Sequence, residues 1–174
     1  AFAHLTVLKN LESIDITYMV RQFTGMGLGY INENLESLGT NSPSLTAEGL
    51  TYLARFKKLK RLNLTGDSLG GRDGLVTDAM LTGLAALTEL EALNVTEQKL
   101  DGSFLACLPA NSKLKRLELF NIKTFKPEHF KHLTRLKNLE YLGLPPGDPG
   151  VDGLTIISGL GALKELVLSG PGFT

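Results

Sequence analysis

SLTAEGLTYLARFKKLKRLNLTGDSL, residues 44–69, contains the pattern that decides the fold of this chain. In its segment RLNLT, residues 61–65, apolar and polar residues alternate, which is typical of a strand with one buried face. Before that segment, Leu50, Leu53 and Phe56 recur at a spacing of three and predict the buried side of a short helix. The stretch therefore predicts one helix followed by one strand.

The same unit recurs along the whole sequence. The central apolar residue of each expected strand falls at Ile14, Leu38, Leu62, Leu93, Leu117, Leu142 and Leu166, and the successive gaps are 24, 24, 31, 24, 25 and 24 residues. A fixed period in the twenties indicates a solenoid, because one helix and one strand cannot bury their own apolar face without a stacked neighbour. The sequence thus predicts a single domain over residues 1–174, with parallel strands on one side and helices on the other.

Three residues mark expected helix starts. Thr46 and Thr77 precede apolar stripes at positions where a hydroxyl caps the first turn, and Pro127 stands at a first helical position. The two ends of the chain have apolar residues, Phe2 and Phe173, and no polar capping unit. Because stable solenoids need such units, we expect that the chain is a fragment of a longer protein or that its ends self-associate.

Composition argues against two classes of partner. Lys and Arg number 18, as do Asp and Glu, so the formal net charge is zero. A chain without net positive charge is a poor match for nucleic acid or an anionic membrane. No run approaches the roughly 20 apolar residues that span a bilayer. The single cysteine, Cys107, lies in the apolar run FLACL and is expected to be a small core residue. We therefore expect neither nucleic-acid binding nor membrane insertion, and the compartment stays open.

The motif LxxLxL, followed by a loop and a further apolar residue, resembles the leucine-rich repeat family over nearly the whole chain. Residues 45–64, LTAEGLTYLARFKKLKRLNL, and residues 76–95, VTDAMLTGLAALTELEALNV, are similar to variable bacterial repeats common in planctomycete proteins. The resemblance implies a right-handed α/β solenoid of about seven repeats of ~24 residues, with a parallel sheet on the concave face and short helices on the convex face. It also implies recognition of proteins or peptides, and it brings no catalytic residues, metal or cofactor.

At one position of the repeat, this chain departs from the residues that are usual in that family. Its members usually have Asn, Cys or Thr three residues after the last strand leucine, where the side chain bonds to the loop backbone. Four repeats of this chain have Asp67, Gln98, Gly147 and Pro171 there instead. We therefore expect irregular loops.

The polar positions of the strands predict the residues of the concave face, where solenoids usually bind. Its N-terminal half is small and polar, whereas Arg116, Phe120, Tyr141 and Val167 fall on adjacent strands ~4.8 Å apart. Arg and Tyr are frequent among interface hot spots. We expect a protein-contact face formed by Arg61, Arg116, Glu118, Phe120, Tyr141 and Val167. The alternative is that Phe120 and Tyr141 only pack on each other across strands.

Other motifs give weaker indications of function. The gap of 31 residues contains Asp67, Asp73 and Asp78, whose spacing fits no EF-hand loop and favours a plain surface loop, with Arg72 and Asp73 at its tip. His129 and His132 are three residues apart and lack a third metal ligand, so a solvated helix flank is favoured. No pattern of a nucleophile elbow, P-loop or zinc site is present.

Two sequons, Asn63-Leu-Thr and Asn94-Val-Thr, fall on the expected binding face, and chance is favoured over use. The sequence thus predicts a non-enzymatic binding scaffold. The alternative is a structural spacer within a larger multidomain protein, without a binding site of its own.

Overall fold

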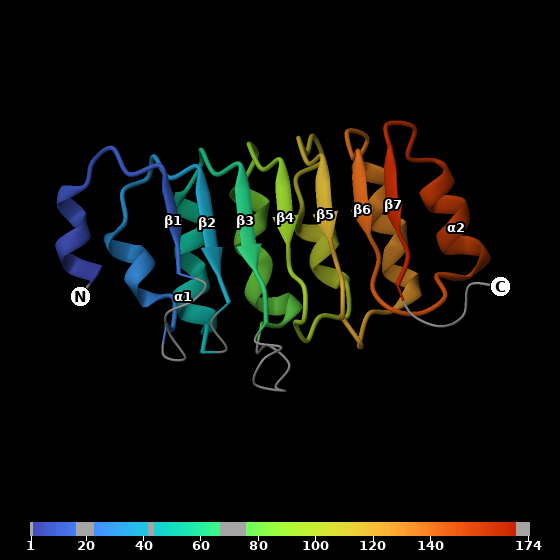
Figure 1. Ribbon diagram of the computed structural model, residues 1–174, viewed down its shortest axis with the longest axis horizontal. Helices are drawn as coiled ribbons and strands as arrows, with labels where there is room; N and C mark the ends of the chain where they lie inside the picture. Colours follow the sequence, from blue (N-terminus) through green and yellow to red (C-terminus); the bar gives the residue numbers. More distant parts are fainter. Residues whose placement is uncertain (1, 17–22, 42–43, 67–75, 170–174) are drawn as a thin grey trace.

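The computed structural model describes residues 2–16, 23–41, 44–66 and 76–169. Within these ranges seven parallel strands form one sheet in the order of the sequence, and Figure 1 shows them side by side from the N-terminal to the C-terminal end. The strands are β1 (Ser13–Asp15), β2 (Ser37–Thr40), β3 (Arg61–Leu64), β4 (Ala92–Asn94), β5 (Arg116–Glu118), β6 (Tyr141–Gly143) and β7 (Glu165–Val167). The α/β leucine-rich-repeat solenoid predicted from the sequence is confirmed.

The strand register follows the sequence period. Leu38 pairs with Leu62, Leu62 with Leu93, and Leu93 with Leu117, so the central apolar residues of neighbouring strands lie opposite one another. The longer gap between Leu62 and Leu93 leaves this register unchanged.

Short helices cover one face of the sheet, behind the strands in the view of Figure 1. They are η1 (Phe2–Val7), η2 (Met26–Tyr30), α1 (Ala47–Thr51), η3 (Tyr52–Arg55), η5 (Asp78–Ala86), η6 (Ser103–Cys107), η7 (Pro127–Arg135) and α2 (Gly150–Ser158). Most are 3₁₀ helices. With three residues per turn, a 3₁₀ helix aligns positions i and i+3 on one face, which matches the apolar spacing of three in the sequence.

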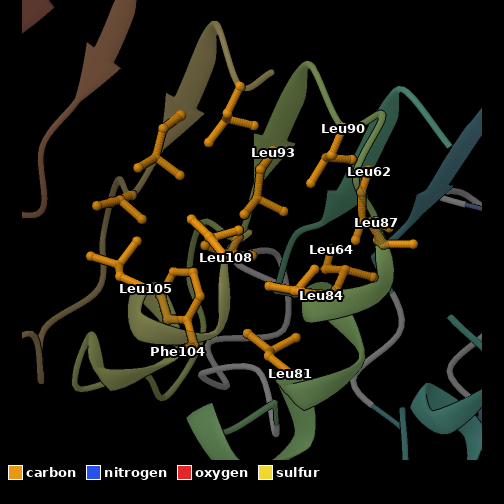
Figure 2. Close-up of a cluster of buried hydrophobic side chains, with 14 of the residues drawn as sticks. Leu62, Leu64, Leu81, Leu84, Leu87, Leu90, Leu93, Phe104, Leu105 and Leu108 are labelled. Carbon is orange, nitrogen blue, oxygen red and sulfur yellow. The ribbon is translucent and has the colours of Figure 1, made fainter. Parts of the chain in front are cut away.

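The core lies between the sheet and the helices. Figure 2 shows Leu62, Leu64 and Leu93 from the strands meeting Leu81 and Leu84 from η5, all of them buried. Each repeat packs mainly on the next one, so a single hydrophobic core runs along the described repeats.

The expected helix starts are found at their predicted positions. The Thr46 hydroxyl accepts a hydrogen bond from the Gly49 amide at 3.1 Å and caps α1. Thr77 occupies the cap position of η5 but makes no side-chain cap hydrogen bond, and Pro127 begins η7. The cap position is therefore predictable here, whereas its hydrogen bond is not.

Gln98 occupies one of the positions that depart from the family pattern, and its side chain is buried. Its side chain is 2% exposed; Oε1 accepts from the Val76 amide at 3.2 Å, and Nε2 donates to the Leu64 carbonyl at 2.8 Å. Gln98 thus ties the loop backbone as the missing asparagine would, although the loop is irregular at Glu97, whose φ is 62°. Asp67 and Pro171 lie outside the described residues.

Asp78 holds the start of the next helix in place. Its carboxylate accepts hydrogen bonds from the backbone amides of Asp101 at 2.7 Å, Gly102 at 3.1 Å and Phe104 at 2.9 Å. The role of this carboxylate is therefore structural. Arg72 and Asp73 of the insertion lie outside the described residues.

Alternating charges run along the edge of the sheet where the strands begin. Lys60 Nζ lies 2.9 Å from Glu36 Oε2, Lys115 Nζ lies 3.2 Å from Glu91 Oε2, and Lys164 Nζ lies 2.6 Å from Glu140 Oε2. Each pair joins two neighbouring repeats. Because the side chains are exposed to solvent, which screens their charges, each pair contributes little to stability.

The ends differ in part from expectation. Phe2 is partly buried, because its ring stacks on Phe23 with 5.2 Å between centroids. Leu154, Ile157 and Leu160 share a spacing of three, but Leu154 is 46% exposed, and Cys107 is half-buried rather than a core residue. Phe173 lies outside the described residues, and self-association through the ends stays a prediction.

None of the described helices is both long and apolar enough to cross a membrane.

Candidate functional site

The side of the sheet opposite the helices is the strand face, and it has an open hollow of about 300 Å³. The outward residues of β1 to β5 line this hollow, among them Ser37, Gly39, Arg61, Asn94 and Arg116. These side chains point outward because residues alternate between the two faces of a strand. The predicted binding face is therefore hollowed mainly over its N-terminal and central strands.

Arg116 and Tyr141 contact each other on the strand face. The two residues pair in register on β5 and β6, and the guanidinium carbon of Arg116 lies 3.5 Å from the centre of the Tyr141 ring. Arg116 Nε donates to Glu118 Oε1 at 2.6 Å. The guanidinium is thus held by a ring on one strand and a carboxylate on its own strand.

The charge state of Arg116 follows from these contacts. Desolvation acts to lower the pKa of Arg116, but the hydrogen bond to Glu118 and the charge of Glu118 outweigh it and raise that pKa. Arg116 therefore stays a cation at any ordinary pH.

Asn94 is a residue of the site that the sequence analysis did not select. Its Nδ2 donates to Glu118 Oε2 at 2.9 Å, and its Oδ1 accepts from the Thr96 amide at 3.0 Å and from the Thr96 hydroxyl. Asn94 thereby positions Glu118, which in turn positions Arg116. A signal was present in the sequence, because Asn94 and Glu118 occupy the same column of neighbouring repeats.

Phe120 and Tyr141 do not pack on each other through their rings among the described residues. Phe120 lies over Gly143, where a side chain would collide with its ring. Each of the two aromatic residues thus has another neighbour, and the contact of these residues with a partner stays a prediction. Val167 pairs in register with Gly143 and is half-buried at the next strand.

Arg61 is separated from the other site residues. It lies on β3, and Ala92 on β4 stands between it and Arg116 in the register. Arg61 is exposed and has no hydrogen bond or ion pair with any residue that the structure describes. The predicted contact face thus divides into an ordered group around Arg116 and an isolated cation at Arg61.

The histidine pair on the helix side is better packed than expected. The His129 and His132 rings stack with 5.8 Å between centroids, and the His129 side chain is 15% exposed, so a solvated flank is the wrong description. Nearby, hydrogen bonds from Ser103 lower the pKa of Asp101 to about 2, with smaller contributions from the charge of His129 and a hydrogen bond from Lys126. Among the described residues, no group of three His, Cys, Asp or Glu residues could hold a metal ion.

Comparisons with known proteins show the fold. No protein-family model matches the chain, and no curated protein matches its sequence. Among solved structures, an internalin (inlF) from Listeria monocytogenes superposes on it with a TM-score of 0.64 and 18% sequence identity. The match covers 97% of this chain and 44% of the internalin chain, so this chain spans less than half of that protein. The finer resemblance to planctomycete repeats stays a prediction.

Proposed function

We propose that this chain is a non-enzymatic scaffold that binds a protein or peptide on its strand face. The observation that carries the proposal is the Arg116–Tyr141 pair, which stands beside an open hollow instead of being covered by the chain itself. Arg and Tyr are among the residues that contribute most to protein–protein binding. The likeness to the internalin supports the proposal only through the shared solenoid fold.

The Arg116 group is well suited to binding because it is ordered before a partner arrives. Glu118 and Tyr141 already fix the guanidinium, and Asn94 fixes Glu118. Ordering a long side chain on binding otherwise costs about 0.5–1.5 kcal/mol. The Nη groups of Arg116 donate no hydrogen bond to any described residue, so a partner carbonyl or carboxylate can accept from them.

The dimensions of the sheet suit an extended segment. Seven strands have six gaps of about 4.8 Å, so the strand face is about 29 Å wide. An extended chain rises about 3.3 Å per residue, so about nine residues cross that width. A peptide is therefore a sufficient probe of the proposed function.

The test is a selection of random displayed peptides on the immobilised chain, followed by fluorescence anisotropy of the enriched peptides. Tyr141→Ala is expected to weaken binding by roughly 30-fold or more, since truncated hot-spot residues cost about 2 kcal/mol or more. Lys131→Ala on the helix side serves as the control and is expected to leave affinity unchanged. If Tyr141→Ala left the affinity of every enriched peptide unchanged, or if no peptide were enriched, the structural spacer would be the better description.

A further inference from the structure

The last strand of the described sheet exposes leucines at positions that are buried in the other repeats. Leu166 is 37% exposed and Leu168 is 42% exposed, whereas Leu142 and Leu144, at the same positions of the preceding repeat, are buried. Leu154 on α2 is exposed as well, and Figure 1 shows α2 and β7 together at the C-terminal end of the sheet. Leu154, Leu166 and Leu168 form the C-terminal face of the solenoid. Apolar surface that gathers on one face is typical of a contact with another protein.

The opposite edge of the described sheet has apolar residues at corresponding positions. Ile14 on β1 is in register with the buried Leu38 but is itself only half-buried. Leu11, which precedes β1, is also half-buried, and Leu8 is exposed. Leu8, Leu11 and Ile14 form the N-terminal face of the solenoid. Because Ile14 and Leu166 are the central apolar residues of the first and last strands, stacking the two faces would continue one row of core residues.

The backbone at these two edges offers complementary donors and an acceptor. At every junction between the seven described strands, two consecutive N–H groups donate to a single carbonyl of the preceding repeat. Lys164 and Glu165, for example, donate to the Glu140 carbonyl at 2.8 and 3.0 Å. In the last repeat Lys164 holds the acceptor position, and in the first repeat Glu12 and Ser13 hold the donor positions, each at an edge of the described sheet. The donors at one edge therefore match the acceptor at the other.

The charges at the start of the strands match in the same order. The residue before each strand is, along the chain, Glu12, Glu36, Lys60, Glu91, Lys115, Glu140 and Lys164. From Glu36 to Lys164, acids and lysines alternate, and each lysine pairs with the acid of the preceding repeat. A second copy stacked after Lys164 would place its Glu12 next, so the alternation of charge would continue. This order favours a second copy of the chain as the unit that covers the C-terminal face.

We propose that the C-terminal face binds the N-terminal face of a second copy of this chain, so that β1 of one copy extends the parallel sheet beyond β7 of the other. In this contact the amides of Glu12 and Ser13 donate to the Lys164 carbonyl, and Ile14 packs against Leu166. The two faces differ, so a pair of copies keeps one open face at each end and further copies can add. The contact uses the edges of the sheet and does not depend on the proposed function of its strand face.

Sedimentation equilibrium of the chain over a series of concentrations gives the first test. The weight-average mass is expected to rise with concentration from the 18.8 kDa of one copy to that of a dimer and beyond, because the contact does not close. A mass that stays at 18.8 kDa up to the solubility limit would overturn the inference and leave the C-terminal face to a partner of another kind.

Two variants that each block one face test which surfaces meet. Leu168→Glu places a charge on the C-terminal face and Leu8→Glu places one on the N-terminal face; both residues are exposed, so the fold should tolerate the change. Each variant alone is expected to be a monomer. An equimolar mixture of the two is expected to form a 1:1 dimer that does not grow, since one open face of each kind remains. If either variant still associated by itself, or if the mixture stayed monomeric, the inference would be overturned.

A charge exchange tests the order of stacking without altering the apolar faces. Lys164→Glu or Glu12→Lys alone is expected to weaken association several-fold, because an attraction between copies becomes a repulsion. The double variant is expected to regain most of the affinity, and added salt should reduce these differences. Lys131→Glu makes the same change of charge on η7 and is expected to have no effect. A double variant that associates no better than the single ones would contradict the head-to-tail contact.

Discussion

Asn94 Nδ2 donates to Glu118 Oε2 at 2.9 Å, so a residue of β4 fixes the carboxylate that holds Arg116 on β5. Three residues of two strands are thereby coupled, and the exposed member depends on the half-buried ones. The order of the binding face thus depends on a network that runs between repeats.

Replacement of Asn94 by Ala is expected to destabilise the fold by about 1 kcal/mol, because hydrogen bonds to a carboxylate contribute about that much or more. Urea denaturation measures the change. Glu33→Ala is the matched control, since its ion pair with Arg55 is exposed at the surface and should contribute less than about 0.5 kcal/mol. Equal effects of the two substitutions would contradict the role given to Asn94.

Gln98→Ala is expected to cost about 2 kcal/mol or more, because it leaves the buried Val76 amide and Leu64 carbonyl without their partner. Chemical denaturation at neutral pH measures this loss. Gln98→Asn is the informative companion, since its amide is the same but its side chain is shorter. Full stability of the Ala variant would show that the loop does not depend on Gln98.

Asp101 gives a dependence of stability on pH. Hydrogen bonds from Ser103 lower its pKa in the folded chain from an ordinary value of 3.8 to about 2. A carboxyl group whose pKa is lowered by folding stabilises the fold at pH values above its ordinary pKa. This contribution is lost as the pH falls through the pKa that the group has in the folded chain. The stability advantage of the unaltered chain over Asp101→Asn should therefore be full above pH of about 4 and disappear near pH 2.

Urea denaturation of both proteins across that range tests this prediction. A difference between the two that stayed constant with pH would show that Asp101 does not titrate as described.

Leu117 and Leu154 both belong to the apolar pattern of the sequence, but only Leu117 is buried in the structure. Leu117 is fully buried on β5, and Leu117→Ala is expected to cost about 2–5 kcal/mol through lost burial and a cavity. Leu154 is 46% exposed on α2, so Leu154→Ala should change stability by less than about 1 kcal/mol. Denaturation midpoints of the two variants measure the contrast, and similar losses would argue against the packing of α2.

The repeat period was sufficient to predict the strand register because each repeat must present its leucines to the same core. The spacing of three in Leu50, Leu53 and Phe56 predicted the buried side of a short helix, but it did not predict that most of the helices are 3₁₀. Leu154 could not be assigned from the pattern, since its exposure depends on which neighbour covers α2.

The sequence was sufficient to predict which residues lie on the strand face, but not which of their side chains contact one another. The columns placed Arg116 and Tyr141 side by side, but whether Tyr141 would contact Arg116 or Phe120 depends on side-chain rotamers. Gly143 has no side chain, so the Phe120 ring occupies the space above it and does not stack on Tyr141. Gln98 was read as a departure from the family, since sequence alone does not show which backbone groups its amide reaches.

The central claim is that the strand face is the binding surface. The most direct measurement is NMR chemical-shift mapping of the isotope-labelled chain on addition of a peptide selected against it. We predict that the shifted amides cluster on β3 to β6, around Arg61, Asn94, Arg116 and Tyr141. Shifts confined to the helices η5, η7 and α2, with none on these strands, would contradict the account.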